Sequence, residues 1–455
     1  MLFKRLLIMP HLLRCLPQKT LNVLSSTPRI FFVRRLASRI ILSNLFLSLL
    51  LGGCHPTKVD PEVQLLLEKL QKEGDLISAK SFEGEIPNDP FDPAWQTATG
   101  FQIPLGSQVS VAPRASSMKK MEITVRSLVS RKEVGFLISW DDPTRDTLES
   151  GVTRFRDAVA LGFPIDFGVG KPIPYIGMGS AGHPVNIWHW KSSWEGGSLP
   201  HPASRDEGPI PPNPSASDGR SPILRRDPLE AGYPVNHRTG EEAGNPLSAY
   251  EHRSPVENLV SEGFGTLTSV SSKQLNGKGI WKDGRWSVVL KRSRSVQETA
   301  VDLSSSKGGV IPITFAVWDG SGGERNGMKG LSRWRFLKLE GESVHKDYLQ
   351  SFMIGPIPGA DPEHGKQLTA EMGCNLCHNF PNQAAMNDVG PDLSYAGLIH
   401  RAEYLLESVK NPSAVVVPAP GYFDPKTLTS TMPSFEGQVA EQDFKDLAEY
   451  LRRLQ

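Results

Sequence analysis

The C-x-x-C-H run at residues 374–378 constrains this chain more than any other feature of its sequence. Two thiols three positions apart can each bond to one vinyl group of a haem, and the histidine that follows then lies under the iron. The same run could be a chance C-x-x-C or half of a zinc site, but a zinc site requires a second Cys/His pair. The other two cysteines both lie within the first 54 residues. We therefore predict a covalent haem c, with Cys374 and Cys377 as thioether anchors and His378 as an iron ligand.

The beginning of the chain has the charge pattern of a targeting segment. No acidic residue precedes Asp60, several basic residues come first, and an apolar run then covers Ile40–Leu51. This order predicts a secretory signal, with an organelle transit peptide as the alternative. The apolar run is shorter than the roughly 20 residues that cross a bilayer. A lasting transmembrane helix is therefore not expected.

Residues 51–54, Leu-Gly-Gly-Cys, resemble a bacterial lipobox. That resemblance implies that residues 1–54 are a lipoprotein leader and that Cys54 becomes an acylated N-terminus. Two or more acyl chains hold a protein stably on a membrane. We expect a protein anchored at Cys54 on the periplasmic, extracytoplasmic face of the cell membrane. The alternative is ordinary cleavage elsewhere, with Cys54 removed or incidental.

Beyond the leader, about 400 residues remain, enough for two or three domains. The formal net charge is +1, so nothing in the composition favours a nucleic-acid partner. The chain contains 42 glycines and 37 prolines, which favours many turns and short strands over a helical bundle.

Residues 355–455 have the pattern of a small all-α domain. Residues 361–363, Asp-Pro-Glu, form a helix start that we expect to continue into Cys374. A middle helix is expected near Arg401–Lys410, and a closing helix carries apolar residues at helical spacing from Phe444 onwards. Loops with the sequences GPDL (390–393) and MPSF (432–435) separate these helices. This order resembles a class I cytochrome c domain.

The resemblance to cytochrome c implies that Met432 is the second axial ligand, opposite His378. Met432 lies in a proline-flanked loop, whereas methionines at helical spacing belong more often to a core. Met372 and Met386 are its competitors, and both lie close to the attachment site in the sequence. An iron with both axial positions filled has no open position for a substrate, and His/Met ligation suits an electron carrier.

Residues 60–350 have the pattern of a β-sandwich. Residues 122–126 and 285–290 alternate polar and apolar side chains, and Val134–Trp140 and Ile311–Trp318 are largely apolar. Asp-Gly pairs at 283–284 and 319–320 predict turns. Two packed sheets are the economical arrangement for such strands. Residues 195–255 are rich in Pro, Gly and Ser without any sustained period, and we predict an inserted loop there.

A series of short stretches gives this middle region a family resemblance. They are residues 92–95 (DPAW), 176–179 (IGMG), 184–191 (PVNIWHWK), 279–290 and 315–320 (FAVWDG), followed by Glu324, Gly327, Lys329 and Trp334. Over residues 85–345 the chain resembles the haem b (gamma) subunits of ethylbenzene dehydrogenase and related type II DMSO-reductase-family complexes, including nitrite oxidoreductase gamma-like subunits. The insert at 195–255 is a departure from that pattern.

This second resemblance implies a non-covalent haem b inside the sandwich, held by a methionine and a lysine. By position these residues are Met178 and Lys329. A lysine binds iron only as a neutral amine, so its pKa must be lowered by burial and by the metal. From the residues alone the alternatives stay open: Lys191 is a rival lysine, Met328 a rival sulfur, and His183 and His189 are rival imidazoles.

Together these features predict a non-catalytic electron-transfer subunit with one haem b and one haem c. The resemblance implies a molybdenum-containing catalytic subunit and an iron–sulfur subunit as partners, and a soluble cytochrome or membrane acceptor beyond them. An alternative is an extracytoplasmic ligand-binding sandwich fused to a mono-haem cytochrome c. A haem peroxidase is disfavoured because the usual di-haem pattern requires a second C-x-x-C-H, and this chain has one.

Overall fold

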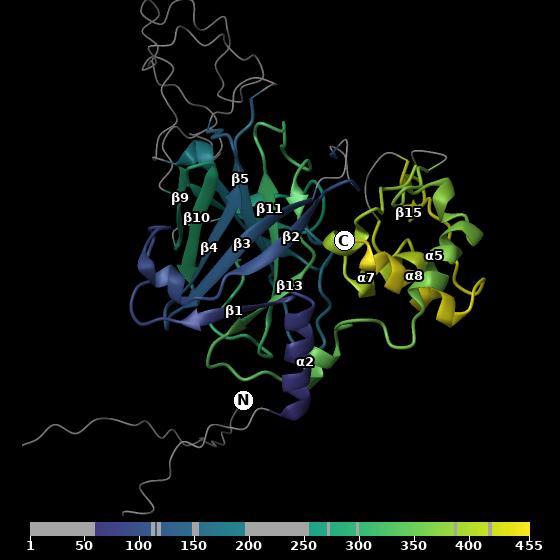
Figure 1. Ribbon diagram of the computed structural model, residues 1–455, viewed down its shortest axis with the longest axis horizontal. Coiled ribbons are helices and arrows are strands. Elements are labelled where there is room, and N and C mark those ends of the chain that lie inside the picture. Colours follow the sequence, from purple (N-terminus) through teal and green to yellow (C-terminus); the bar gives the residue numbers. More distant parts are fainter. Residues whose placement is uncertain are drawn as a thin grey trace, which may run out of the picture. The chain divides into compact units, whose positions relative to one another are not determined.

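Strands make up the middle of the chain and helices its end (Figure 1). The computed structural model describes residues 60–110, 114–115, 120–147, 154–195, 254–270, 274–296, 300–385, 389–416 and 421–455, all within the structural unit Val59–Gln455. The expected leader with Cys54, most of the expected insert, and Met386 lie outside the described residues.

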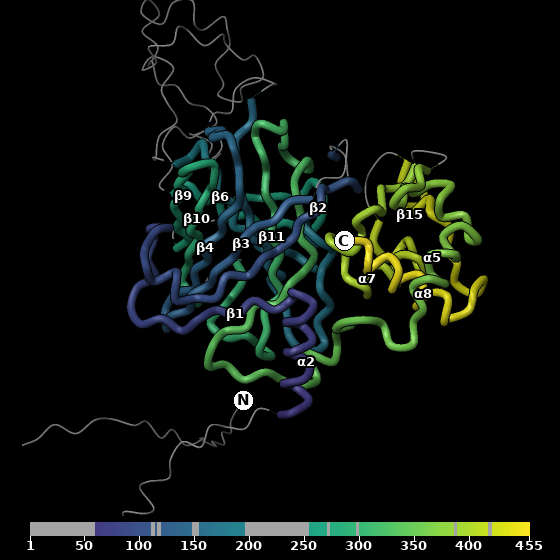
Figure 2. Tube along the Cα trace, viewed as in Figure 1, coloured from purple at the N-terminus to yellow at the C-terminus, as the bar shows by residue number. Residues whose placement is uncertain are grey.

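Thirteen strands join in one hydrogen-bonded sheet. They are β1 Leu76–Ser81, β2 Phe101–Ser107, β3 Lys120–Val129, β4 Glu133–Asp141, β5 Ala158–Pro164, β6 Val185–Lys191, β7 Val256–Ser261, β8 Thr268–Val270, β9 Leu275–Lys282, β10 Arg285–Ser293, β11 Ile311–Trp318, β12 Gly330–Leu331 and β13 Arg335–Leu339. The main path runs β8-β7-β6-β5-β11-β12-β2-β3-β4-β10-β9. Off this path, β1 pairs in parallel with β13 (Figure 1) and with β3 (Figure 2), and β13 pairs with β11, so segments distant in sequence close the sheet on itself.

The expected strands are confirmed. The alternating segments lie in β3 and β10, and the apolar segments form β4 and β11. Asp283 and Gly284 join β9 to β10 as a two-residue hairpin, with φ of 53° and 76°. Positive φ at both positions is the requirement of a type I′ turn, which explains the Asp-Gly pair.

The sheet folds over so that two parts of it pack face to face. Trp286 of β10 lies 5.0 Å, between ring centroids, from Trp190 of β6, and Phe136 of β4 lies 6.1 Å from Phe163 of β5. These rings belong to a buried cluster with inward-facing residues of nearly every long strand. The middle of the chain is therefore a largely β-sheet domain, in which both expected layers belong to one continuous sheet.

The helical end of the chain follows the expected order with one correction. Its helices are α5 Pro362–Glu371, α6 Ala396–Ile399, α7 Ala402–Lys410 and α8 Glu441–Arg453, and a short ladder joins β14 Phe423–Asp424 to β15 Thr429–Ser430. The Asp361 side chain caps α5 by accepting hydrogen bonds from the amides of residues 363 and 364. Contrary to expectation, α5 does not reach Cys374, because Gly373 adopts a left-handed conformation with φ of 71° that ends the helix.

Two further helices cover the β-sheet domain at its sequence ends. Helix α2, Pro61–Lys72, is capped by Asp60, and it packs through Leu70 and its neighbours against the short helix α4, Lys346–Gln350. In the described part of the chain, no helix has the length and apolar character needed to cross a membrane.

A buried carboxylate joins the sheet to the helical end. Asp75, just before β1, accepts hydrogen bonds from Arg333 at 2.9 Å, Arg335 at 2.6 Å and Arg401 at 3.3 Å. Burial alone would raise the pKa of Asp75, but the three guanidinium groups outweigh it and hold that pKa below its usual value. Because the folded-state pKa is depressed, this stabilisation is present above the usual pKa and is lost as pH falls through the folded value.

The first prediction concerns this joint. Changing Asp75 to asparagine should lower the free energy of unfolding by roughly 3–5 kcal/mol, because it leaves buried guanidinium groups without their counter-charge. The matched control is Asp166→Asn, whose exposed ion pair with Lys171 should contribute less than about 1 kcal/mol. Urea unfolding curves measure both. Equal losses in the two variants would show that Asp75 is not a structural joint.

Candidate functional site

Two large cavities carry the side chains expected to bind cofactors. The first has a volume of about 390 Å³, and Met178, His189, Trp318 and Lys329 are among its lining residues; we call it the sheet cavity. The second has a volume of about 460 Å³, and its lining includes residues 374, 377 and 378 and Met432; we call it the helix cavity. Both volumes lie in the range of about 300–1,000 Å³ usual for cofactor and ligand sites.

The sheet cavity lies on the outer face of the sheet and not between the layers. Along β5, Val159 points into the packed core, while Ala158 and Ala160 line the cavity together with Ala316 of β11. Alanines on that face leave room that larger side chains would fill. The cavity with the expected haem b ligands thus lies on the outer face of the sheet, whereas aromatic rings fill the interior between the layers.

Met178 is held at the cavity by a glycine-flanked turn. Gly177 and Gly179 have φ of 88° and 74°, and a Cβ on Gly179 would lie 2.8 Å from the carbonyl oxygen of His183. The Met178 carbonyl accepts a hydrogen bond of 2.8 Å from the amide of Gly263. The turn at Met178 therefore favours glycine on both sides of the methionine, which explains the Gly-Met-Gly sequence.

Lys329 reaches the cavity from the loop between β11 and β12. This loop is tied to the end of β2, because the Gln108 amide N–H donates to the Lys329 carbonyl at 2.8 Å and the Gln108 side chain donates to Gly327 at 2.9 Å. The Lys329 Nζ lies 5.0 Å from the ring centroid of Trp318. Burial lowers the pKa of Lys329 to about 8. A large share of this amine is therefore neutral in mildly alkaline solution.

The rival residues are placed differently. Lys191 is 2% exposed, forms an ion pair with Glu257 and does not line the sheet cavity. Met328 and the exposed His183 do not line it either.

His189 is the one rival that lines the sheet cavity. Its ring stacks on Trp318 at 4.7 Å between centroids, and its Nε2 is buried without a hydrogen-bond partner. Burial, with Lys191 and other nearby cations, lowers the pKa of His189 well below its usual value, so the imidazole is neutral. Trp318 therefore contacts both the His189 ring and the Lys329 ammonium group.

In the helix cavity, both cysteines are free thiols on a short turn. Cys374–Leu376 form one turn of 3₁₀ helix, and the amide of His378 donates to the carbonyl of Cys374 at 2.9 Å. Burial raises the pKa of Cys374 to about 11, so this residue is a thiol at neutral pH. The turn places both sulfur atoms and the imidazole on the lining of one cavity.

The His378 ring is oriented by two residues of the GPDL loop. Its Nδ1 lies 2.8 Å from the carbonyl oxygen of Pro391, to which it donates, and this leaves Nε2 as the nitrogen able to bind a metal. A Cβ on Gly390 would lie 2.5 Å from Cε1 of the ring. Gly390 is therefore a positioning residue for the His378 ring, a role that the GPDL sequence alone did not indicate.

Met432 lines the same cavity as His378. Its amide donates to Ser430 Oγ at 3.2 Å, in the loop that follows the β14–β15 ladder. Met372 also lines the cavity, so it stays a competitor, whereas Met386 lies outside the described residues.

The two cavities share part of their wall. Ser110, Tyr175 and Ile399 line both of them. Tyr175 lies 5.3 Å from Tyr404 between ring centroids, and His400 stacks on Tyr404 at 4.5 Å. No motif signalled these residues, because they meet only when α6 and α7 pack against the sheet.

Comparison with known proteins gives one family match. The model of the family described as ethylbenzene dehydrogenase matches residues 92–330. A protein of Haloferax mediterranei, provisionally named as a respiratory nitrate reductase heme subunit, is 25% identical over 54% of this chain and 67% of its own length. The chlorate reductase subunit gamma of Ideonella dechloratans is 24% identical over 58% of this chain and 84% of its own length.

Two further similarities are weaker. The dimethylsulfide dehydrogenase subunit gamma of Rhodovulum sulfidophilum is 25% identical over 56% of this chain and 76% of its own length. Among solved structures, a family 9 carbohydrate binding module of Caldicellulosiruptor kristjanssonii aligns with 59% of this chain and 95% of its own, at 10% identity and a TM-score of 0.28. A likeness that low assigns no ligand to this chain.

The second prediction concerns the amine of Lys329. In the haem-free protein it should titrate near pH 8, because burial disfavours the ammonium form. Reductive methylation with a ¹³C label followed by NMR titration measures each lysine separately. The early-titrating signal should be absent from Lys329→Gln, and its persistence there would mean that another lysine produces it.

Proposed function

The chain belongs to the ethylbenzene dehydrogenase family, and from that membership we propose that it is an electron-transfer subunit with two haems. Haem b would bind in the sheet cavity and a covalent haem c in the helix cavity. The names of its relatives, a heme subunit and two gamma subunits of oxidoreductases, support this role. No described residue is assigned a catalytic role.

One observation supports the proposal most strongly. Two cavities share part of their wall, and each is lined by side chains that can bind a haem iron. Met178 and Lys329 offer a thioether and a weakly basic amine in the sheet cavity. His378 and Met432 offer an imidazole and a thioether in the helix cavity. When bound, each haem supplies an iron that accepts and releases one electron.

Each ligand residue has a definite task in this proposal. The Pro391 carbonyl keeps a proton on Nδ1 of His378, which leaves Nε2 unprotonated, and this nitrogen would hold the iron of haem c. Met432 would hold the same iron through its thioether sulfur. Lys329 must lose its proton before it binds iron, and burial lowers the cost of that loss.

The proposed partners follow from the family. A molybdenum-containing catalytic subunit and an iron–sulfur subunit would exchange electrons with haem b, and haem c would serve a soluble cytochrome or a membrane acceptor. The catalytic subunit sets the substrate and the direction of electron flow. The Leu-Gly-Gly-Cys sequence at 51–54 supports a further proposal, that Cys54 is acylated and anchors the chain to the extracytoplasmic side of the membrane.

A pyridine haemochrome spectrum of the purified protein tests the proposal as a whole. Haem b and haem c in equal amounts would support it. Haem c alone would favour the alternative, in which the β-sheet domain binds a different ligand and only the helical end transfers electrons.

The third prediction concerns the covalent attachment. Changing Cys374 and Cys377 together to alanine should remove the haem mass from the polypeptide in mass spectrometry and leave the b-type spectrum intact, because the two sites use separate side chains. If the wild-type polypeptide carries no haem adduct at these cysteines, the haem c assignment fails.

The fourth prediction uses matched pairs to locate haem b. Met178→Leu and Lys329→Leu keep most of the side-chain volume and remove the donor atom, so each should deplete haem b by severalfold relative to haem c. Met328→Leu is the control, because Met328 lies beside Lys329 in sequence but does not line the cavity. Full haem b in Lys329→Leu, together with its loss in His189→Leu, would assign the iron to His189.

A further inference from the structure

Tyr175 is a buried residue of the wall that the sheet cavity and the helix cavity share. It lines both cavities, and only 7% of it is exposed. It lies in the loop between β5 and β6, three residues before Met178, and its carbonyl accepts a hydrogen bond of 3.2 Å from the amide of Gly179. The turn that holds Met178 at the sheet cavity therefore begins at Tyr175.

The Tyr175 hydroxyl is also linked to the loop that carries Lys329. Ser110 is a hydrogen-bond partner of this hydroxyl and lines both cavities as well. The Ser110 amide donates to the side-chain oxygen of Gln108 at 2.6 Å, and the Gln108 amide donates to the Lys329 carbonyl at 2.8 Å. Tyr175 is thus joined through a few bonds to both residues that we propose as ligands of haem b.

On the side of the helix cavity, Tyr175 meets two rings of the helical end. Tyr404 of α7 lies edge-on to it at 5.3 Å between centroids, and the two hydroxyls are hydrogen-bond partners. His400 stacks on Tyr404 at 4.5 Å and lies 6.1 Å from Tyr175. Aromatic pairs with centroids about 4.5–7 Å apart are in contact. Tyr404 and His400 line the helix cavity, so aromatic contact continues from one cavity to the other.

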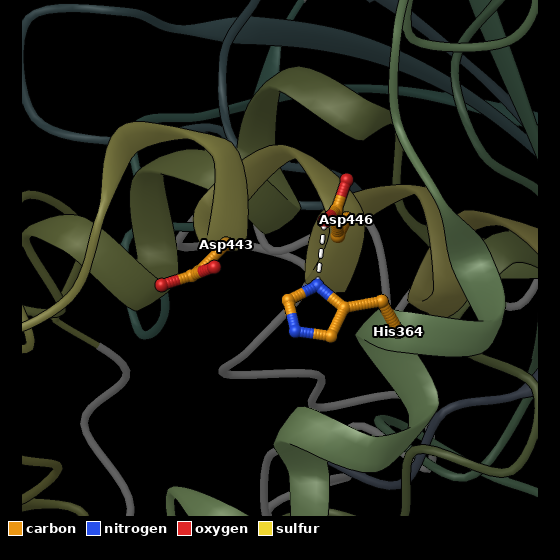
Figure 3. Close-up of side chains that lie close together, drawn as sticks. All are labelled: His364, Asp443 and Asp446. Carbon is orange, nitrogen blue, oxygen red and sulfur yellow. Dashed lines mark hydrogen bonds and ion pairs between the residues drawn. The ribbon is translucent and has the colours of Figure 1, made fainter.

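The packing of the helical end fixes these rings relative to the turn at Cys374. The amide of Gly397 in α6 donates to the carbonyl of Leu454 at 2.9 Å, which ties α6 to the end of α8. Helix α8 is tied to α5, because the His364 ring is hydrogen-bonded to Asp446 at 2.8 Å (Figure 3). Helix α5 ends just before Cys374. The separation between the ring contact and the cysteine turn is therefore set by helix packing.

We propose that the Tyr175–Tyr404 ring pair is the bridge through which electrons pass between the haem b site and the haem c site. This inference rests on the two-haem function proposed above. Electrons tunnel faster through bonded and closely packed atoms than through open space, and aromatic rings couple more strongly than saturated side chains such as Ile399. In one transfer, a ferrous iron loses one electron and the ferric iron of the other haem gains it. Neither tyrosine is oxidised, and no proton moves.

The test measures electron transfer between the haems in the full chain with both haems bound. A photochemical reductant delivers one electron in a laser flash, and the separate absorbance bands of haem b and haem c report how fast that electron is shared. Tyr175→Leu and Tyr404→Leu should each slow this step severalfold, at unchanged haem content and unchanged midpoint potentials. Tyr175→Phe keeps the ring and should retain most of the rate.

Two further variants sharpen the result. Combining Tyr175→Leu with Tyr404→Leu should slow transfer little more than either change alone, because residues of one path are not additive. Tyr450→Leu is the matched control: Tyr450 stacks on Phe380 in the helical end at 6.3 Å between centroids but lines neither cavity. It should keep the wild-type rate. Equal slowing in Tyr450→Leu would show that any loss of packing has this effect, and the bridge would be rejected.

The remaining outcomes separate the bridge from the function on which it rests. A wild-type rate in Tyr175→Leu, with both haems present, would overturn the bridge and leave the two-haem function standing. Slowing that comes with shifted potentials or lost haem would also overturn it, because Tyr175 would then only support a haem site. If Tyr175→Leu fails to fold, the half-buried Tyr404 decides the result. A wild type with a single kind of haem would refute the proposed function itself, and the haemochrome spectrum reveals this before any variant is made.

Discussion

The Asp75 carboxylate is the constraint on which the relation between the two cavities depends. It accepts hydrogen bonds from Arg335 of β13, from Arg333 just before that strand, and from Arg401, the residue before α7. Arg333 also donates to the carbonyls of Gly397 and Leu398 in α6. A buried network of this kind is stable only when every member is present. It thereby fixes α6, whose Ile399 forms part of both cavities.

The wall between the two cavities includes Tyr175, with Tyr404 and His400 packed beside it, and these side chains are uncharged. Burial raises the pKa of Tyr175 well above its usual value and raises that of Tyr404 as well, while burial lowers the pKa of His400 to about 4. All three groups are therefore neutral across the physiological range. In the proposed electron-transfer role, a neutral wall separates the two haems without a titrating group, so its charge would not change with pH.

Local signals in the sequence predicted much of the fold, because those signals act within a few residues. The Asp283-Gly284 hairpin and the capped start at Asp361 are examples, since each depends on φ or on one capping side chain. The end of α5 was missed, although Gly373 was visible in the sequence. The cavity on the outer face could not be predicted. Alternation of side chains along β5 assigns them to two faces of the sheet, but it does not show which face α6, distant in the sequence, will cover.

The same limit explains why two lysines could not be separated by sequence. Lys191 is buried and Lys329 is half-buried, and each lies near a tryptophan ring. Lys191 lies opposite a strand that supplies Glu257, so its ammonium has a carboxylate partner. For Lys329, burial is the cause of the lowered pKa, and no carboxylate among the described residues offsets that effect. A lysine of this kind becomes a weak base only when no carboxylate lies near its ammonium group, and strand pairing determines whether one does.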